Sequence, residues 1–203
     1  LALAREGANV CVADVDAEGG EETTQEIIDA GGKAIFVSCD VTSSDDVNAM
    51  VKATVETFGR LDAAVNNAGI SGAFTKRIHE YDDDMFDHIM SINVKGVWMC
   101  MKAELPIMLE QGSGSIVNMA SVAGLIGATK GAAYTASKHA VVGMTKSAAL
   151  EYAKFGLRVN SICPSYTDTS MVTAFIEETP AMQNILMRSN PMRRLGQPTE
   201  IAE

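Results

Sequence analysis

The chain has 203 residues, of which 47% are hydrophobic and 21% are charged, and its formal net charge is −10. This length and apolar content are enough for one well-buried domain but not for two of similar size. The acidic balance argues against a nucleic-acid partner, because binding to a phosphate backbone depends on clustered Lys and Arg. No apolar run approaches the roughly 20 residues that span a bilayer, so we expect no membrane partner.

The four cysteines, Cys11, Cys39, Cys100 and Cys163, do not have the spacing of metal ligands, and neither do the three histidines. Three of these cysteines lie in short apolar runs, where a reduced thiol packs as a small hydrophobic side chain. We therefore expect no catalytic metal, and a reducing, cytoplasmic location.

Short β-type runs alternate with amphipathic helical runs along the whole chain. In chain order, the expected elements are the end of a helix at 1–7, a strand at 9–13, a helix at 18–30, a strand at 34–39, a helix from Ser43 or Ser44 to Phe58, a strand at 62–66, a long helix at 83–109, a strand at 115–119, a helix at 133–155 and a strand at 158–163. This alternation, with mostly continuous apolar strands, predicts a parallel sheet covered by helices on both faces, which is a doubly wound α/β fold. Ligands bind beyond the carboxyl ends of the strands in such sheets, so functional residues should follow each strand.

Tyr134 and Lys138 are four residues apart in the predicted helix 133–155, so their side chains share one face. A free tyrosine has a pKa near ~10, and a nearby ammonium favours the phenolate, which moves the phenol towards the range of a useful acid–base. By itself this pair is a weak motif. Ser121, thirteen residues earlier and just past a strand, strengthens it, because its hydroxyl is placed to hold a substrate oxygen beside the phenol.

Two further features follow strands and point to a dinucleotide. Asn66-Asn67-Ala68-Gly69 consists of residues that tolerate left-handed backbone and let the chain pass close to a flat ligand. Asp14 ends the first strand, where dinucleotide-binding folds place a carboxylate on the adenosine ribose 2′-OH. That carboxylate repels a 2′-phosphate, so NAD is favoured over NADP. A helix N-cap is an alternative role for Asp14 and is compatible with this one.

These residues resemble the short-chain dehydrogenase/reductase family, in its single-domain branch. The matching residues run in order along the chain and are Asp40-Val41, Asn66-Asn67-Ala68-Gly69, Asn93 within Ser-Ile-Asn-Val-Lys-Gly, Ser121, Tyr134 with Lys138, and Pro164-Ser165 with Thr169. Within the family, the chain is most similar to bacterial glucose 1-dehydrogenases and to dehydrogenases of cyclic alcohols and diols. The resemblance implies one NAD(P)-binding Rossmann-type domain over residues 1–203, and a homo-oligomer, either a tetramer or a dimer.

The resemblance also implies a role for each matching residue. Tyr134 would be the acid–base, Lys138 would lower its pKa and bind the nicotinamide ribose, and Ser121 would polarise the substrate oxygen. Asn93 would open the long helix and hold a water that relays protons from Lys138 to solvent. The other implied cofactor contacts are Asp40 at the adenine with the Val41 backbone beside it, Asn67, Ala68 and Gly69 along the adenine-side ribose, and Pro164, Thr167 and Thr169 at the nicotinamide amide.

Some features depart from the family pattern. Ser165 stands where the family usually has Gly, which either narrows the nicotinamide pocket or replaces one small residue by another. The glycine-rich phosphate loop with its strand, expected before Leu1, and the last strand, expected after Glu203, are not in the sequence. In the family's strand order 3-2-1-4-5-6-7, that first strand belongs between the strands at 9–13 and 62–66. We therefore expect an incomplete domain, and residues 1–203 alone to be poorly soluble and inactive.

The predicted function is interconversion of a secondary alcohol and a ketone by hydride transfer to or from NAD. The loops after Gly69 and Ser121 and the segment 166–188 should line the substrate pocket. Its apolar residues are Val122, Leu125, Ile126, Met171, Phe175 and Ile176, which favours a cyclic or aliphatic alcohol over a phosphorylated sugar. The alternatives are a nucleotide-binding regulator that has lost turnover, and a dehydratase or epimerase, whose chains are usually longer.

Overall fold

The computed structural model describes residues 1–72, 74–178 and 180–203. Its strands are β1 (Asn9–Asp14), β2 (Lys33–Ser38), β3 (Ala63–Asn66), β4 (Gly114–Met119) and β5 (Leu157–Ile162). The α-helices are α1 (Ala2–Arg5), α2 (Ala17–Asp29), α3 (Ser44–Phe58), α4 (Asp83–Met90), α5 (Val97–Gln111), α6 (Ala132–Tyr152), α7 (Ser170–Glu178), α8 (Met182–Ser189) and α9 (Pro198–Ala202). Shorter turns are η1 (Ile78–Glu80), η2 (Ser91–Gly96), η3 (Val122–Gly124) and η4 (Ala153–Phe155). Every predicted strand is confirmed.

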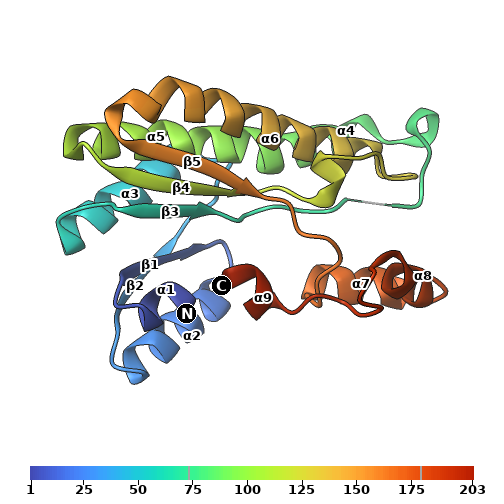
Figure 1. Cartoon of the computed structure of the whole chain (residues 1–203), viewed down its shortest axis with the longest axis horizontal. Coiled ribbons are helices and arrows are strands. Elements are labelled where there is room, and N and C mark those ends of the chain that lie inside the picture. Colours follow the sequence, from blue (N-terminus) through green and yellow to red (C-terminus); the bar gives the residue numbers. More distant parts are fainter. Residues whose placement is uncertain (73, 179) are drawn as a thin grey trace.

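The strands form two parallel sheets, one of β1 and β2 and the other in the order β3-β4-β5. Figure 1 shows the first sheet with α1 and α2, apart from the second sheet with α4, α5 and α6. Helix α3 links the two, because it contacts α5 as well as both strands of the first sheet. The strand order agrees with the doubly wound arrangement that the sequence predicts, with β2 and β1 on one side and β3, β4 and β5 on the other.

The main hydrophobic core lies between the second sheet and the two long helices α5 and α6. Its buried members are Val97, Met101, Leu105, Met108, Ile116, Ala120, Val141, Val142, Ala148, Leu157 and Val159. Burial of this apolar set is the chief driving force for packing α5 and α6 on β4 and β5. A smaller cluster of Cys39, Val47 and Cys100 joins the end of β2 to α3 and α5. The two clusters hold the carboxyl ends of the strands in place.

Buried polar side chains connect the elements beneath the end of β3. Asn66 on β3 donates to Asn118 Oδ1 on β4 at 3.0 Å and to Glu104 Oε2 on α5 at 3.2 Å. Asn118 Nδ2 in turn donates to Thr145 Oγ1 on α6 at 2.9 Å. Burial raises the pKa of Glu104 to about 7. Because buried polar groups need partners, these bonds fix how α5, β3, β4 and α6 meet.

The predicted helix over 83–109 is present, but it is not α-helical throughout. The segment is divided into α4, the π-helical turn η2 and α5. Asn93 lies inside the π-helical turn and is fully buried, so it interrupts the helical segment and does not open it. A π-helical turn adds one residue to the helix locally, and such turns often occur at functional sites. Apolar periodicity over the whole segment does not reveal a single added residue.

After β5 the chain leaves the sheet and forms α7 and α8, which the sequence did not predict as helices (Figure 1, orange to red). We call residues 168–196 the arm. Its two ends are held together at a neck, where Thr167 forms a β-bridge with Gly196. The Asp168 N–H donates to Gly196 O at 2.8 Å, and the Gly196 N–H donates to Tyr166 O at 2.9 Å.

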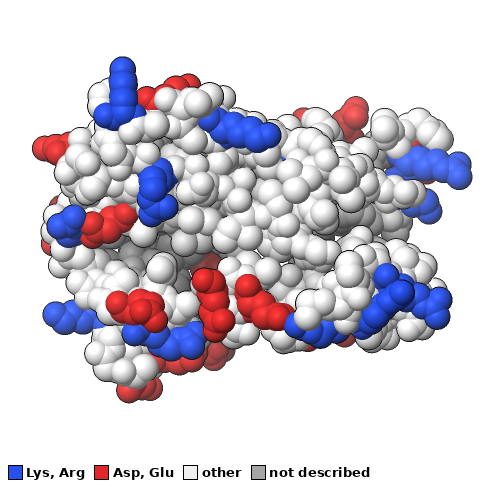
Figure 2. Space-filling model, in the orientation of Figure 1, with Lys and Arg blue, Asp and Glu red and all other residues white. Residues whose placement is uncertain are grey.

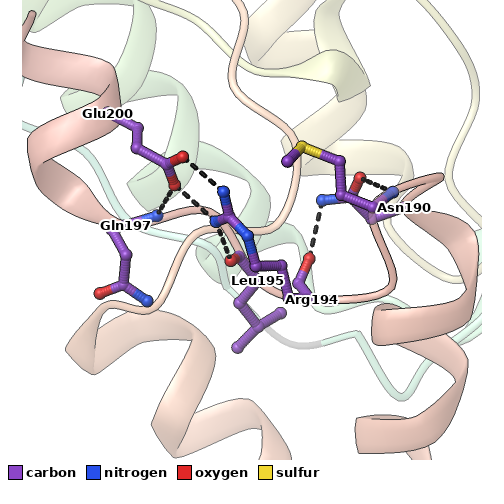
Figure 3. A network of polar contacts seen from close by, with 6 residues as sticks. Asn190, Arg194, Leu195, Gln197 and Glu200 are labelled. Atoms are coloured by element: carbon purple, nitrogen blue, oxygen red, sulfur yellow. Dashed lines mark hydrogen bonds and ion pairs between the residues drawn. The ribbon is translucent and has the colours of Figure 1, made fainter.

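An ion pair lies directly beside the neck (Figure 3). Arg194 donates to both carboxylate oxygens of Glu200, at 2.7 and 2.6 Å. The Gln197 N–H donates to the same carboxylate at 2.7 Å, and Asn190 Nδ2 donates to Arg194 O at 2.7 Å. The hydrogen bond from Arg194 and that from Gln197 hold the pKa of Glu200 down at about 2.

The described surface carries charges of both signs. On the face shown in Figure 2, some Lys and Arg side chains gather at the lower right, and the others are scattered among uncharged surface and acidic residues. None of the described helices combines the length and the apolar composition needed to cross a membrane.

Candidate active site

Three of the predicted functional side chains meet beyond the carboxyl end of β4. Tyr134 and Lys138 lie in the first turns of α6, and Ser121 follows β4 directly. The hydroxyl of Ser121 accepts a hydrogen bond from the Ala123 N–H at 3.2 Å, which caps η3. The Ser121 side chain lies near enough to the Tyr134 hydroxyl to favour the phenolate. A substrate oxygen placed there would reach both hydroxyls.

The charge environment of Tyr134 differs from the expectation. Burial raises the pKa of Tyr134, and the nearby Ser121 side chain opposes this only in part. Lys138 Nζ lies 5.6 Å from the Tyr134 ring centroid and donates to Met119 O at 2.8 Å, so the ammonium is bound to the end of β4. Burial also lowers the pKa of Lys138 to about 8. The phenol pKa is thus shifted in the direction opposite to the one that the sequence predicted from Lys138.

Asn93 joins the loop after β3 to helix α6. Its Oδ1 accepts from the Ile70 N–H at 2.8 Å, and its Nδ2 donates to Ile70 O at 2.9 Å and to Ser137 Oγ at 3.0 Å. The Ser137 hydroxyl then donates to Tyr134 O at 2.7 Å. Both N–H groups of the Asn93 side chain are thus used within the protein. The chain of bonds leads from the loop to the helical turn that carries Tyr134.

Sequence reasoning missed Ser137, which is fully buried between Tyr134 and Lys138. The only signal was its place beside Lys138 in Tyr-Thr-Ala-Ser-Lys, on a helix expected to pack on the sheet. Gly69, by contrast, was predicted. A Cβ atom there would lie 3.1 Å from Asn93 Oδ1 and 3.4 Å from Lys138 Nζ, so the absence of a side chain lets the loop run close to both. Asn67 and Ala68 beside it are exposed.

The acidic residues predicted at the first sheet lie at its carboxyl end. Asp14 is the last residue of β1, is exposed, and accepts from the Asp16 N–H at 3.0 Å. The N-cap of α2 is Asp16, so Asp14 is not the helix cap. Asp40 follows β2 and accepts two hydrogen bonds from Thr42, both at 2.8 Å, which lower the pKa of Asp40. Val41 is half-buried beside it.

The residues predicted at the nicotinamide follow β5. The carbonyl of Pro164 accepts from the Val122 N–H at 2.8 Å, which joins this segment to the residues after Ser121. Thr167 is buried, and its hydroxyl donates to Ser165 O at 3.2 Å. Thr169 Oγ1 donates to Thr167 O at 3.4 Å.

Among the predicted pocket residues, Phe175 is connected to Tyr134 by a third aromatic side chain, Phe74, which the sequence did not single out. The Phe74 ring lies 5.6 Å from that of Tyr134 and 5.7 Å from that of Phe175, between centroids. Leu125 and Ile126 are 57% and 59% exposed. Residue 179, within the predicted pocket segment 166–188, lies outside the described residues.

The arrangement fits a dinucleotide. Asp14 and Asp40 offer acceptors beyond β1 and β2, and the loop at 67–69 is open to solvent or lacks a side chain. Lys138 donates to Met119 O and, within the described residues, to no other protein acceptor, which leaves N–H groups for ligand hydroxyls. Among the same residues, no group of three His, Cys, Asp or Glu side chains is placed to share a metal ion.

Comparisons with known proteins identify the family of this chain. The model of a family described as enoyl-(acyl carrier protein) reductase, one of the short-chain dehydrogenase/reductase type, matches residues 1–203. A cyclohexanol dehydrogenase from Acinetobacter sp. (strain SE19) is 39% identical over 203 residues, which cover 100% of this chain and 78% of the relative.

Solved structures give the same result. An NAD⁺-bound xylitol dehydrogenase is 35% identical with a TM-score of 0.94, and the match covers 100% of this chain and 82% of that one. An actinorhodin polyketide ketoreductase variant with NADPH is 36% identical with a TM-score of 0.93, covering 99% and 80%. The chain therefore belongs to the short-chain dehydrogenase/reductase family, whose members are oxidoreductases acting on CH–OH groups.

Proposed function

We propose that the protein interconverts a secondary alcohol and a ketone with NAD as cofactor and Tyr134 as the acid–base. The observation that carries this proposal is the half-buried Tyr134 phenol beside the Ser121 side chain, with Lys138 one turn further along α6. The named activities of relatives, such as cyclohexanol dehydrogenase, support oxidation of an alcohol. The two hydroxyls hold one substrate oxygen between them.

Ser121, Tyr134 and Lys138 have separate roles in the proposed reaction. Ser121 donates to the substrate oxygen and orients it. Tyr134, as the phenolate, takes the hydroxyl proton in oxidation and, as the phenol, returns it in reduction. Lys138, whose pKa is about 8, is mostly charged at neutral pH and stabilises the phenolate as the proton leaves. The nicotinamide ring of the dinucleotide, when bound, exchanges a hydride with the carbon that carries the oxygen.

Asn93 has a positioning role in this scheme. Its side-chain N–H groups are both bound to protein atoms, so they are not free to donate to a relaying water. We propose that Asn93 holds the loop after β3 against α6. A water between Lys138 and solvent would then be bound by other groups.

The residues that would hold the dinucleotide in one domain over 1–203 are Asp14, Asp40, Val41, Asn67, Ala68, Gly69, Tyr134, Lys138, Pro164, Thr167 and Thr169. Family members bind either NAD⁺ or NADPH, as the two solved relatives illustrate, so the choice depends on residues of this chain. The exposed Asp14 carboxylate accepts ribose hydroxyl hydrogen bonds and repels a 2′-phosphate. Val15 and Asp16, which follow it, offer no cation for a phosphate. NAD is therefore the favoured cofactor.

A screen of NAD⁺ reduction tests the activity. The protein expressed from its full gene is assayed against cyclic and aliphatic secondary alcohols, with NAD⁺ and NADP⁺ in parallel. We expect turnover with NAD⁺ to exceed that with NADP⁺, and Asp14→Ala to narrow the difference. Equal use of both cofactors by the wild-type protein contradicts the role of Asp14, and no turnover with any alcohol contradicts the proposed activity.

We also propose a homo-oligomer in a reducing, cytoplasmic setting. Trp98 on α5 is 56% exposed, and Leu150 on α6 is 84% exposed. A groove of about 530 Å³ beside Trp98 is lined by Asp87, Met90, Ser91, Val94, Lys95 and Met144. Exposed apolar side chains of this size are common at protein interfaces, and a second copy is the proposed cover. Sedimentation of the wild type and of Trp98→Glu tests this, with smaller particles expected for the variant.

A further inference from the structure

Three aromatic side chains from separate segments meet beside the candidate active site. Phe74, in the loop after β3, packs against Tyr134 at an interplanar angle of 61° and against Phe175 of α7 at 59°. The ring centroids are 5.6 and 5.7 Å apart, within the range of attractive edge-to-face contacts. Phe74 therefore connects the acid–base residue to the arm.

The place of the Phe74 ring depends on a glycine. A Cβ atom at Gly131, just before α6, would lie 2.3 Å from Cε1 and 2.9 Å from Cδ1 of Phe74. The φ angle of Gly131 is −115°, which any residue can adopt, so its backbone conformation does not require glycine. What glycine supplies at this position is room for the ring.

The contacts of Phe74 and Phe175 differ from those of the core. Neither ring belongs to the buried core clusters, and both are half-buried. Both come from connecting segments at the site and not from the strands that build the sheet. Two half-open rings beside a reactive hydroxyl leave apolar surface for a ligand to cover.

We propose that Phe74 and Phe175 form an aromatic wall that selects secondary alcohols with a ring-shaped carbon skeleton. This inference rests on the proposed function, in which the substrate oxygen lies between Ser121 and Tyr134. With the oxygen fixed there, the carbon skeleton extends past Tyr134 and meets its aromatic neighbours. A flat or cyclic skeleton covers a ring face over a wide area, whereas a three-carbon alcohol ends before it gains this contact.

The selectivity for a ring-shaped skeleton is measured by comparing a cyclic with an acyclic alcohol. Protein expressed from its full gene is assayed with NAD⁺ and either cyclohexanol or propan-2-ol, as wild type, Phe74→Ala and Phe175→Ala. Each alanine variant should lower kcat/KM for cyclohexanol by roughly tenfold, the scale of one lost aromatic contact, and change that for propan-2-ol less than about threefold. Phe74→Leu, which keeps an apolar side chain, should lie between.

Gly131→Ala gives an independent test, because it displaces the Phe74 ring without removing it. It should lower the cyclohexanol to propan-2-ol ratio in the same direction as Phe74→Ala, and it keeps the question answerable if the alanine variant fails to fold. The control is Phe155→Ala, which deletes the same atoms from an exposed ring at the other end of α6, about 30 Å away by helix length.

The outcomes distinguish a failure of the aromatic wall from a failure of the proposed function. A ratio that stays at the wild-type value in Phe74→Leu and Gly131→Ala, while both activities persist, overturns the aromatic wall alone. An equal loss for both alcohols also overturns it, since that result marks the rings as structural. A wild-type protein that prefers propan-2-ol to cyclohexanol also overturns the wall alone, whereas one that oxidises no alcohol of the wider screen overturns the proposed function together with the wall.

Discussion

The residues around Tyr134 and the arm are held in place by different means. Asn93, Ser137 and Lys138 are buried, and each bonds to a segment remote in sequence or to the turn that carries Tyr134. In the arm, Leu186 is fully buried, but Ile185 and Met192 are 55% and 68% exposed, and among the described residues the main-chain bonds from the arm to the rest of the chain lie at the neck. The proposed chemistry thus depends on a well-anchored region, while part of the proposed substrate contact comes from a more exposed one, as is common for ligand-binding segments.

Removing the phenol oxygen should have the largest effect on the anchored region. Tyr134→Phe keeps the ring and its contact with Phe74 but deletes the only group proposed to carry the proton. We expect kcat to fall by roughly 10²–10⁴-fold, the usual contribution of a general acid–base. Dinucleotide affinity, measured by calorimetric titration, should change little. Activity within a few-fold of wild type would remove Tyr134 from the mechanism.

The buried polar network in the same region can be tested through Glu104, whose ionisation makes the stability of the fold depend on pH. An acid with a higher pKa in the folded chain binds its proton more tightly when folded, so its contribution to stability is complete below the unfolded pKa and is lost as pH rises through the folded one. With a pKa of about 7 against an ordinary 4.5, Glu104 should cost about 3 kcal/mol of stability between pH 4.5 and pH 7.

Glu104→Gln removes this titration and keeps an acceptor for Asn66. Urea unfolding at several pH values should show that the variant loses less stability than the wild type as pH rises from 4.5 to 7. The stability of the variant, relative to that of the wild type, should therefore be higher at pH 7 than at pH 4.5. Parallel curves for the two proteins would mean that Glu104 ionises as freely in the folded chain as in the unfolded one.

Ser137 tests whether the bonds to the Tyr134 turn matter for turnover. Ser137→Ala breaks the link from Asn93 to the Tyr134 carbonyl while leaving every proposed catalytic side chain intact. We expect kcat to drop by about tenfold with KM for the alcohol nearly constant, since one buried hydrogen bond is worth about 1–2 kcal/mol. Ser147→Ala, at an exposed position of the same helix, is the matched control. Equal kcat values for the two variants would make Ser137 a packing residue only.

The smallest effect is expected at the edge of the arm. Glu200→Gln weakens the exposed ion pair with Arg194 but leaves the main-chain bonds at the neck. Exposed pairs contribute little, so kcat/KM for a cyclic alcohol should stay within about twofold. Because the pKa of Glu200 is about 2, the wild-type pair should persist at every pH used for assay. A large loss of activity would show that the side chains, and not the neck, hold the arm in place.

Much of the fold was predictable, because parallel strands buried on both faces are continuous apolar runs and because Ser43 caps α3 as its sequence position indicates. Tyr134 and Lys138 were identified by their spacing, and Ser121 by its place after a strand. The helices of the arm were not predicted, and neither was the π-helical turn at Asn93, since one added residue leaves the apolar pattern nearly unchanged.

The remaining differences depend on tertiary packing. The Tyr134 pKa is raised because folding buries much of the phenol, which local spacing does not reveal. The roles of Ser137 and Phe74 likewise come from partners far away in the chain. When the role of a side chain depends on a contact with a residue distant in the sequence, the residues next to it in the sequence do not predict that role.

The neck has a consequence for how substrate preference can change. Because Thr167 and Gly196 already hold the ends of the arm together, the entropy of closing the loop depends only weakly on its length, at about 0.6 kcal/mol for each doubling. Lengthening the arm between these ends should therefore cost little closing entropy, provided that the neck survives. Arms taken from relatives with other substrates should be graftable between the same two positions, where each would face an unchanged Tyr134 and Ser121.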